Sequence, residues 1–281
     1  MGLPMAGHLL KAGHELTVHS RTKSKADDLL AKGARWANTP AEAAQAADIV
    51  FICVTDTPDV LAVVQGENGI ESAARPGLIV VDHSTISPSA TRRMAESLGA
   101  KGAKFLDAPV SGGDVGARNG TLSIMVGGDE QALEKSREVI AAYGKTITYC
   151  GGAGAGQLTK LVNQILVTVT NLAVCEAMNF AERNGLDAHK TLAAVSGGAA
   201  GSWQLSNLGP KMIARDFAPG FMIDLQQKDL RLVMQAAQEA KVCLPATSLV
   251  HHLFTAAQAE GRGKEGTQAL FTVIEKLSRP R

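Results

Sequence analysis

Residues 48–54 read DIVFICV, a run in which every side chain after Asp48 is apolar. Uninterrupted apolar runs of this length are typical of parallel strands that helices cover on both faces. Residues 78–82 read LIVVD and repeat the pattern after the interval of about 30 residues that one strand–helix–strand unit occupies. The two runs therefore predict two strands of a parallel sheet, joined by a helix.

The same alternation of strands and helices extends on both sides of these two runs. Further candidate strands cover residues 15–20, 104–106, 122–126 and 146–149. Helical patterns cover residues 24–32, 40–47 and 130–143. Such an alternation predicts a doubly wound α/β domain of the Rossmann type.

The pattern changes after Cys150. Residues 151–156, GGAGAG, form a glycine-rich breaker, and everything beyond them is helical in pattern. Residues 157–184 predict one long helix, residues 226–241 carry another, and Asp187 and Ser206 mark two more. We expect Gly209-Pro210 and Pro219-Gly220 to separate the helices. The predicted organisation is an α/β domain over residues 1–152 and an all-α domain over residues 153–281.

The first six residues, MGLPMA, look like the end of the dinucleotide-binding loop G-x-G-x-x-G. Glycines in that loop permit a tight turn and let the backbone approach a pyrophosphate at a helix N-terminus. Gly2 and Met5 are therefore candidate cofactor contacts, and the strand that precedes such a loop is absent. We expect the natural protein to begin about a dozen residues earlier, with that strand and two more glycines. The alternative is a plain N-terminal helix.

The end of the strand at residues 15–20 is where an acidic side chain would select NAD, by hydrogen-bonding the ribose 2′-hydroxyl. The chain instead reads Ser20-Arg21-Thr22-Lys23, with no carboxylate before Asp27. Arg21 and Thr22 could accept the 2′-phosphate of NADP, which favours NADP while leaving NAD possible. The alternative is ordinary solvated surface charge.

Composition excludes several classes of function. The 28 basic and 27 acidic residues leave a net charge of +1, so we expect neither a nucleic acid nor a membrane as partner. The uncharged residues 161–175 fall short of the ~20 that span a bilayer. The four cysteines are too far apart for a zinc or redox motif and are expected to be buried thiols. With no HxxxH among the histidines, we expect no metal. Because residues 161–175 are too few to span a bilayer, we expect a cytoplasmic protein.

Three further segments share a pattern with a known family. They are DAPVSGGDVGARNGTL at residues 107–122, GAGQLTKLVNQ at 154–164 and FMIDLQQKDL at 221–230. Together with the start of the chain, they resemble the β-hydroxyacid dehydrogenase family. That family includes 3-hydroxyisobutyrate dehydrogenase, tartronate semialdehyde reductase and the glyoxylate or succinic semialdehyde reductases. The resemblance implies an oxidoreductase that transfers a hydride between NAD(P) and a small hydroxy acid or semialdehyde.

The resemblance also implies roles for individual residues. Lys160 is expected to be the general acid, because an ammonium can stabilise the oxyanion that hydride transfer creates and donate its proton. Asn163 lies three residues later on the same helix face and could hydrogen-bond the same substrate. The loop of Ser111, Gly112 and Gly113 offers a hydroxyl and backbone N–H groups that could hold a substrate carboxylate. The alternative for this loop is a glycine turn needed only for folding.

The remaining expected contacts are to the cofactor. Thr85, just past a strand, is expected to face the nicotinamide. Phe221, Lys228 and Asp229 match family positions that close over cofactor and substrate from the helical domain, although Phe221 could equally pack in a core. The active site is expected in the cleft between the two domains.

The activity expected from these features is reduction of tartronate semialdehyde to glycerate by an NADP-preferring enzyme. The substrate is a small carboxylate-bearing aldehyde or hydroxy acid, and the assembly is a homodimer or homotetramer. 3-Hydroxyisobutyrate dehydrogenase and glyoxylate or succinic semialdehyde reductase activities remain alternatives, because one methyl or hydroxyl in a pocket is worth only ~1 to 3 kcal/mol. A catalytically silent oligomeric scaffold is the alternative from another class.

Overall fold

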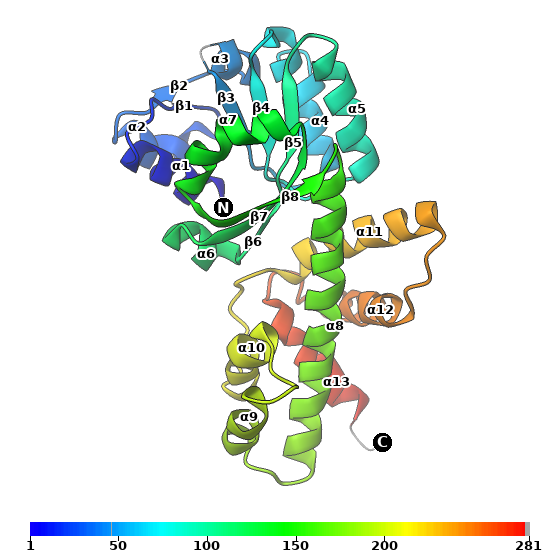
Figure 1. Ribbon diagram of the computed structural model, residues 1–281. Helices are drawn as coiled ribbons and strands as arrows, with labels where there is room; N and C mark the ends of the chain where they lie inside the picture. Colours follow the sequence, from blue (N-terminus) through cyan, green and yellow to red (C-terminus); the bar gives the residue numbers. More distant parts are fainter. Residues whose placement is uncertain (46, 279–281) are drawn as a thin grey trace. The chain divides into compact units, whose positions relative to one another are not determined.

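The computed structural model describes residues 1–45 and 47–278, so Ala46, in the helix expected over residues 40–47, lies outside the described residues (Figure 1). The chain forms two compact units, Met1–Lys160 and Leu161–Arg281. The first is an α/β unit and the second is helical. This confirms the predicted fold class, a Rossmann-like domain followed by an all-α domain.

The first unit alternates strands and helices as predicted. Its strands are β1 (Thr17–Val18), β2 (Arg35–Trp36), β3 (Ile49–Ile52), β4 (Ile79–Asp82), β5 (Lys104–Asp107), β6 (Val110–Ser111), β7 (Leu122–Gly128) and β8 (Gly144–Gly151). Its helices are α1 (Gly2–Lys11), α2 (Asp27–Leu30), α3 (Pro40–Gln45), α4 (Thr57–Gln65), α5 (Pro88–Gly99), α6 (Gly113–Asn119) and α7 (Glu130–Ala141), with 3-10 turns η1 (Lys23–Ala26) and η2 (Ile70–Ala73).

The strands form two sheets. A six-stranded sheet has the order β3-β4-β5-β7-β6, with β8 also paired to β7, while β1 and β2 form a separate parallel pair. Strands β3, β4 and β5 are parallel, but β7 runs antiparallel to both β5 and β6. The sheet is therefore mixed, and the two strands expected to be parallel, β3 and β4, are parallel in it. Between β6 and β7 the only helix is the seven-residue α6, which ends at Gly120 in the left-handed conformation (φ 67°), and the chain turns back beside β6.

Strand β4 shows why the apolar runs are continuous. Ile79 and Val81 pack on one face of the sheet, with Leu133 of α7 among others. Val80 packs on the other face with α4 and α5, whose ribbons lie together beside the sheet in Figure 1. Because side chains alternate between faces, a strand that is buried on both sides must be apolar at every position.

The second unit is built from helices. They are α8 (Ala155–Arg183), which begins in the first unit, α9 (Ala188–Ser196), α10 (Trp203–Ile213), α11 (Ile223–Ala240), α12 (Pro245–Ala259), the 3-10 turn η3 (Thr267–Ala269) and α13 (Leu270–Leu277). Their core includes Met178, Met212, Leu230, Phe254 and Phe271, one from each of five helices. The long helix expected over residues 157–184 is thus present as α8.

One expectation for this unit is wrong. Gly209-Pro210 does not separate helices, since both residues lie inside α10. A Cβ on Gly209 would lie 2.9 Å from the Leu192 side chain, so the glycine allows α9 to approach α10 closely. Ser206 also lies inside α10, and the helix is capped by Ser202, whose Oγ accepts from Leu205 N at 3.0 Å.

The cysteines differ from expectation in their burial. All four are free thiols, but Cys175 alone is fully buried, while Cys243 is exposed and Cys53 and Cys150 are half-buried. The apolar stretch around Cys175 belongs to α8, which is long and apolar enough to cross a membrane by length and composition alone. The core helix of a globular unit passes the same test, and α8 contributes Leu172, Val174 and Met178 to such a core.

Candidate active site

The first unit brings several of the predicted motifs to the carboxyl ends of its parallel strands, where ligands bind in open α/β sheets. Strand β4 ends at Asp82, whose Oδ1 accepts from Ser84 N at 2.9 Å. The Ser84 hydroxyl in turn accepts from Val54 N, just past β3, at 2.9 Å. These bonds hold the segment that contains Thr85 against the neighbouring strand.

Strand β5 ends at Asp107, whose carboxylate is fully buried. Oδ1 accepts from Gly154 N and Oδ2 from Gln157 N, each at 2.8 Å, so this side chain caps the start of α8. Burial raises the pKa of Asp107 to about 6, although the backbone N–H donors act to lower it. A carboxylate is therefore held in apolar surroundings by the first turn of α8.

Lys160 lies in the second turn of α8 and is only 8% exposed. Such burial is uncommon for lysine and indicates a role beyond a solvated surface charge. Gln157, three residues earlier and fully buried, donates from Nε2 to Ser84 O at 2.8 Å. Its Oε1 accepts from Ile86 N at 3.0 Å. The turn that precedes Lys160 is thus bonded to the segment after β4.

The glycine loop after β6 has the backbone that its sequence requires. Gly112 and Gly113 have φ values of 122° and 61°, conformations that favour glycine. Both glycines are exposed and Ser111 is half-buried, so their N–H groups and the hydroxyl lie at or near the surface. A role for this loop in holding an anion stays a prediction.

In the second unit, two hydrogen bonds and one ion pair join four polar side chains. Gln164 donates from Nε2 to Asp229 Oδ2 at 2.6 Å, and Lys228 Nζ lies 2.7 Å from Asp229 Oδ1. Because a carboxylate only accepts, Gln164 must present its NH₂ there and its Oε1 to Asn163, whose Nδ2 donates to it at 2.8 Å. Asp229 thereby sets the amide orientation of Asn163.

Two protein-family models together match almost the entire chain. One, described as the NAD binding domain of 6-phosphogluconate dehydrogenase, matches residues 1–152. The other, described as the NAD-binding domain of NADP-dependent 3-hydroxyisobutyrate dehydrogenase, matches residues 154–274. The chain belongs to the 3-hydroxyisobutyrate dehydrogenase-like family. It is therefore an NAD(P)-dependent oxidoreductase of the β-hydroxyacid dehydrogenase type, which confirms the resemblance.

Individual relatives agree with this assignment. The chain is 44% identical to the 2-hydroxy-3-oxopropionate reductase of Escherichia coli, over 99% of this chain and 95% of the relative. It is 36% identical to the 2-(hydroxymethyl)glutarate dehydrogenase of Eubacterium barkeri, over 99% and 93%. The solved structure of Mycobacterium tuberculosis 3-hydroxyisobutyrate dehydrogenase with L-serine has a TM-score of 0.89 at 31% identity, over 98% and 95%.

The residues expected to contact the cofactor of this dehydrogenase differ in how far they are buried. Gly2 is the first residue of α1, whereas the Met5 side chain is buried in the sheet core, which leaves the backbone as the part of Met5 able to meet a cofactor. Arg21 is 79% exposed, and its Nη1 lies 3.1 Å from Asp59 Oδ1, while Thr22 is exposed beside it. Phe221 is half-buried, and its carbonyl accepts from Thr267 N at 3.1 Å.

Sequence reasoning missed three features of the dehydrogenase. Asp59, the carboxylate beside Arg21, comes from α4 rather than from the end of β1. Asp107 and Gln157 lie in the motifs at residues 107–122 and 154–164, but no pattern in the sequence shows that they meet. Gln164 lies beside Asn163 in the second motif, and no pattern shows that it meets Asp229. A polar residue within an apolar stretch, as Gln157 and Gln164 are, is the one signal that could have drawn attention to them.

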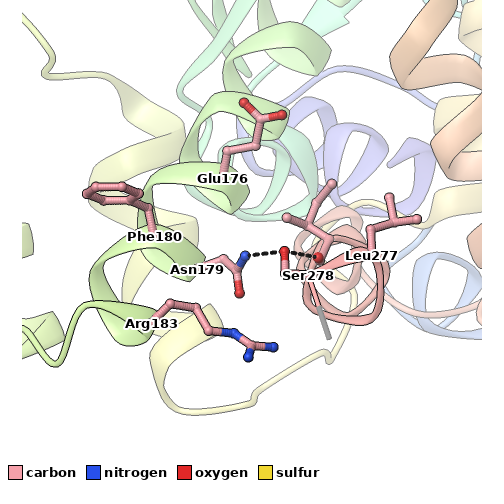
Figure 2. A pocket seen from close by; sticks show the side chains of 7 residues that line it. Glu176, Asn179, Phe180, Arg183, Leu277 and Ser278 are labelled. Carbon is pink, nitrogen blue, oxygen red and sulfur yellow. Dashed lines mark hydrogen bonds between the residues drawn. The ribbon is translucent and has the colours of Figure 1, made fainter. Parts of the chain in front are cut away.

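A separate hollow of about 490 Å³ lies in the second unit, between the ends of α8 and α13 (Figure 2). Asn179 lines it and donates from Nδ2 to Ser278 Oγ at 2.8 Å, with Glu176 and Arg183 nearby. None of the predicted site residues lines this hollow. Within the described residues, no group of three His, Cys, Asp or Glu side chains is placed to hold a metal ion.

Proposed function

We propose that this dehydrogenase reduces tartronate semialdehyde (2-hydroxy-3-oxopropionate) to glycerate, with NADPH preferred over NADH. The observation that carries the proposal is a lysine only 8% exposed, Lys160. It lies on a helix whose first turn is bonded to the end of one parallel strand and to the loop that follows another. The 44% identity to the Escherichia coli reductase supports this substrate among those of the family.

The first unit fits a dinucleotide. Helix α1 begins at Gly2 with no side-chain cap and no acidic residue in its first turn, so its N–H groups suit a pyrophosphate. The exposed Arg21 guanidinium suits a 2′-phosphate. NADPH, when bound, supplies the hydride that reduces the aldehyde carbon.

The residues of the chain would supply the rest of the reaction. As the C–H bond forms, the aldehyde oxygen gains negative charge, and Lys160 Nζ stabilises that charge and donates one proton to it, which leaves an alcohol and a neutral amine. Ser111 with the N–H groups of Gly112 and Gly113 would hold the substrate carboxylate. Asn163 would hydrogen-bond the substrate hydroxyl. Thr85, Phe221, Lys228 and Asp229 would contact the cofactor.

The test is a panel of aldehydes, comprising tartronate semialdehyde, methylmalonate semialdehyde, glyoxylate and succinic semialdehyde, each with NADPH and with NADH. We expect the largest kcat/KM for tartronate semialdehyde with NADPH. A larger value for methylmalonate semialdehyde would identify a 3-hydroxyisobutyrate dehydrogenase instead, the second candidate that the 31% identical structure supports. Absence of turnover with every pair would favour the catalytically silent scaffold.

The proposed enzyme works in the cytoplasm as a homodimer or homotetramer. Val162 and Leu166 are 56% and 64% exposed and lie four residues apart on one face of α8. Large apolar side chains on one helix face are suited to burial against another copy of the chain. This face is the surface that we assign to assembly.

A further inference from the structure

Three motif segments that are far apart in the sequence meet at the start of α8. The hydrogen bonds of Gln157 to Ile86 N and Ser84 O span 71 and 73 residues. Those of Asp107 to the N–H groups of Gly154 and Gln157 span 47 and 50 residues. All four bonds lie within the first unit, which ends at Lys160.

The Asp107 contact leaves no space for movement. A Cβ on Gly156 would lie 2.4 Å from Asp107 O and 2.5 Å from Met125 O. A Cβ on Gly127 would lie 2.7 Å from Asp107 Oδ1. Such distances mean that the backbone of α8 packs directly on strands β5 and β7, where only glycine fits. The first turn of α8 is therefore fixed by close packing as well as by its cap.

Gln157 adds a second tie, to a different segment. Its amide oxygen accepts from Ile86 N and its amide nitrogen donates to Ser84 O, so both bonds flank Thr85. The two bonds allow only one orientation of the amide, because exchanging the oxygen and nitrogen would place donor against donor and acceptor against acceptor. Thr85 is held between two contacts from one side chain, which lies one turn before Lys160.

We infer that Gln157, supported by Asp107, is a positioning residue that fixes Lys160 relative to the Thr85 segment. The inference rests on the proposed function, in which Thr85 contacts the nicotinamide and Lys160 donates the proton. Hydride and proton must reach adjacent atoms of one carbonyl, so the spacing of these two groups decides the rate. A misplacement of about 1 Å can lower a rate about 10²-fold.

The central variant is Gln157→Met, which keeps the side-chain length but removes both bonds. The matched control is Arg75→Met, because Arg75 likewise makes two side-chain bonds to the backbone of the first unit, donating to Ala44 O at 3.0 Å and Ala47 O at 2.7 Å. Each variant is compared with wild type for kcat, the Kd of NADPH and the primary isotope effect with NADPH deuterated at the transferred position. An isotope effect is insensitive to the fraction of folded enzyme.

Gln157→Met is expected to lower kcat at least 10-fold and to raise the isotope effect, with the Kd of NADPH changed less than about 3-fold, the scale of misaligned transfer. Arg75→Met is expected to keep the wild-type kcat and isotope effect. An unchanged isotope effect in Gln157→Met, or a kcat within twofold of Arg75→Met, would overturn the inference. A wild-type protein without turnover would overturn the proposed function instead.

Gln157→Glu provides an independent arm if the methionine variant does not fold. A protonated glutamic acid can still donate to Ser84 O and accept from Ile86 N, whereas the carboxylate cannot donate. Its kcat relative to wild type is therefore expected to rise at least 5-fold from pH 8 to pH 5.5, within the range over which buried carboxyls titrate. A ratio that is constant with pH would contradict a positioning role.

Discussion

Arg21 already has a carboxylate partner, Asp59, whose Oδ1 lies 3.1 Å from its guanidinium. A 2′-phosphate bound by Arg21 would have to share it with that negative charge. We expect Asp59→Asn to tighten NADPH binding about 2- to 5-fold, the scale of an exposed ion pair, and to leave NADH binding unchanged. Arg21→Ala is the matched opposite, which should weaken NADPH alone. Calorimetric titration with both cofactors measures these Kd values. Equal changes in the Kd of NADPH and of NADH would show that neither side chain recognises the 2′-phosphate.

His83 is a fully buried histidine that the proposed chemistry does not use. Its Nδ1 donates to Ala108 O at 2.6 Å, so its Nε2 accepts from the Tyr143 hydroxyl at 2.7 Å, and the ring stacks on Phe51. Burial lowers the pKa of His83 from 6.5 to about 4. Between these pH values the unfolded chain binds a proton that the folded protein does not bind, so the unfolding free energy falls as the pH drops from 6.5 towards 4.

Asp107 acts in the opposite sense, because its pKa is raised to about 6. As the pH falls, the folded protein binds this proton before the unfolded chain does, so the unfolding free energy rises as the pH falls from 6 towards 3.8. Between pH 7.5 and 4.5, His83 should lower the unfolding free energy by about 2 to 3 kcal/mol, and Asp107 should raise it by about 2 kcal/mol. We expect His83→Phe to abolish the first change and Asp107→Asn to abolish the second. The exposed His189→Phe should change neither. Urea unfolding at the two pH values tests this, and parallel pH dependences in all variants would contradict it.

Residue roles could be predicted only where a motif carried them. Lys160 and Ser111 stand at positions that the family pattern names, and both remain predictions until variants are measured. The partners of Asp107 and Gln157 could not be found, because hydrogen bonds that span 47 to 73 residues leave no periodic trace in the sequence.

At the scale of elements, the start of α8 shows how closely backbone segments pack. Gly156→Ala would place a methyl group 2.4 Å from Asp107 O, and we expect it to lower the unfolding free energy by about 3 kcal/mol, as overpacking of a tight site does. Gly152→Ala is the control, since nothing lies within 4 Å of its Cβ position. Thermal unfolding of the two variants tests the packing. An equal Tm for both would show that α8 can shift without cost.

Elements with strong periodicity were predicted well. Strands β3, β4 and β5 and helix α8 follow from continuous or helical apolar patterns, because burial on several sides demands them. The direction of β7 could not be predicted, since strand orientation depends on how the seven-residue α6 ends rather than on the residues of the strand. The end of a helix was wrongly expected at Gly209-Pro210, because the residue that requires a glycine there, Leu192, lies in another helix.

At the scale of the whole molecule, the exposed apolar face of α8 predicts assembly. Leu166→Lys would place a charge on that face, and burying an unpaired charge against another copy is costly. We expect the variant to show a smaller mass than wild type by light scattering at micromolar concentration. Val115→Lys, at an equally exposed site on α6, should keep the wild-type mass. A wild-type mass for Leu166→Lys would remove this face from the assembly.

The order of fold classes, an α/β part followed by a helical part, was predictable from the change of pattern at the glycine-rich residues 151–156. The family models match residues 1–152 and 154–274, whereas the compact units divide at Lys160, because α8 begins in the first unit and continues into the second. A helix that crosses a division of this kind has no signature in the sequence, since its apolar pattern is continuous.

We propose that Lys160 donates the proton in aldehyde reduction. The most direct measurement is the steady-state rate of NADPH oxidation with tartronate semialdehyde for wild type and Lys160→Ala, with NADPH affinity measured on the same samples. If Lys160 is the general acid, we expect a kcat lower by about 10²-fold or more, the scale of general acid catalysis, and an NADPH Kd close to that of wild type. A near-normal kcat in Lys160→Ala would contradict it.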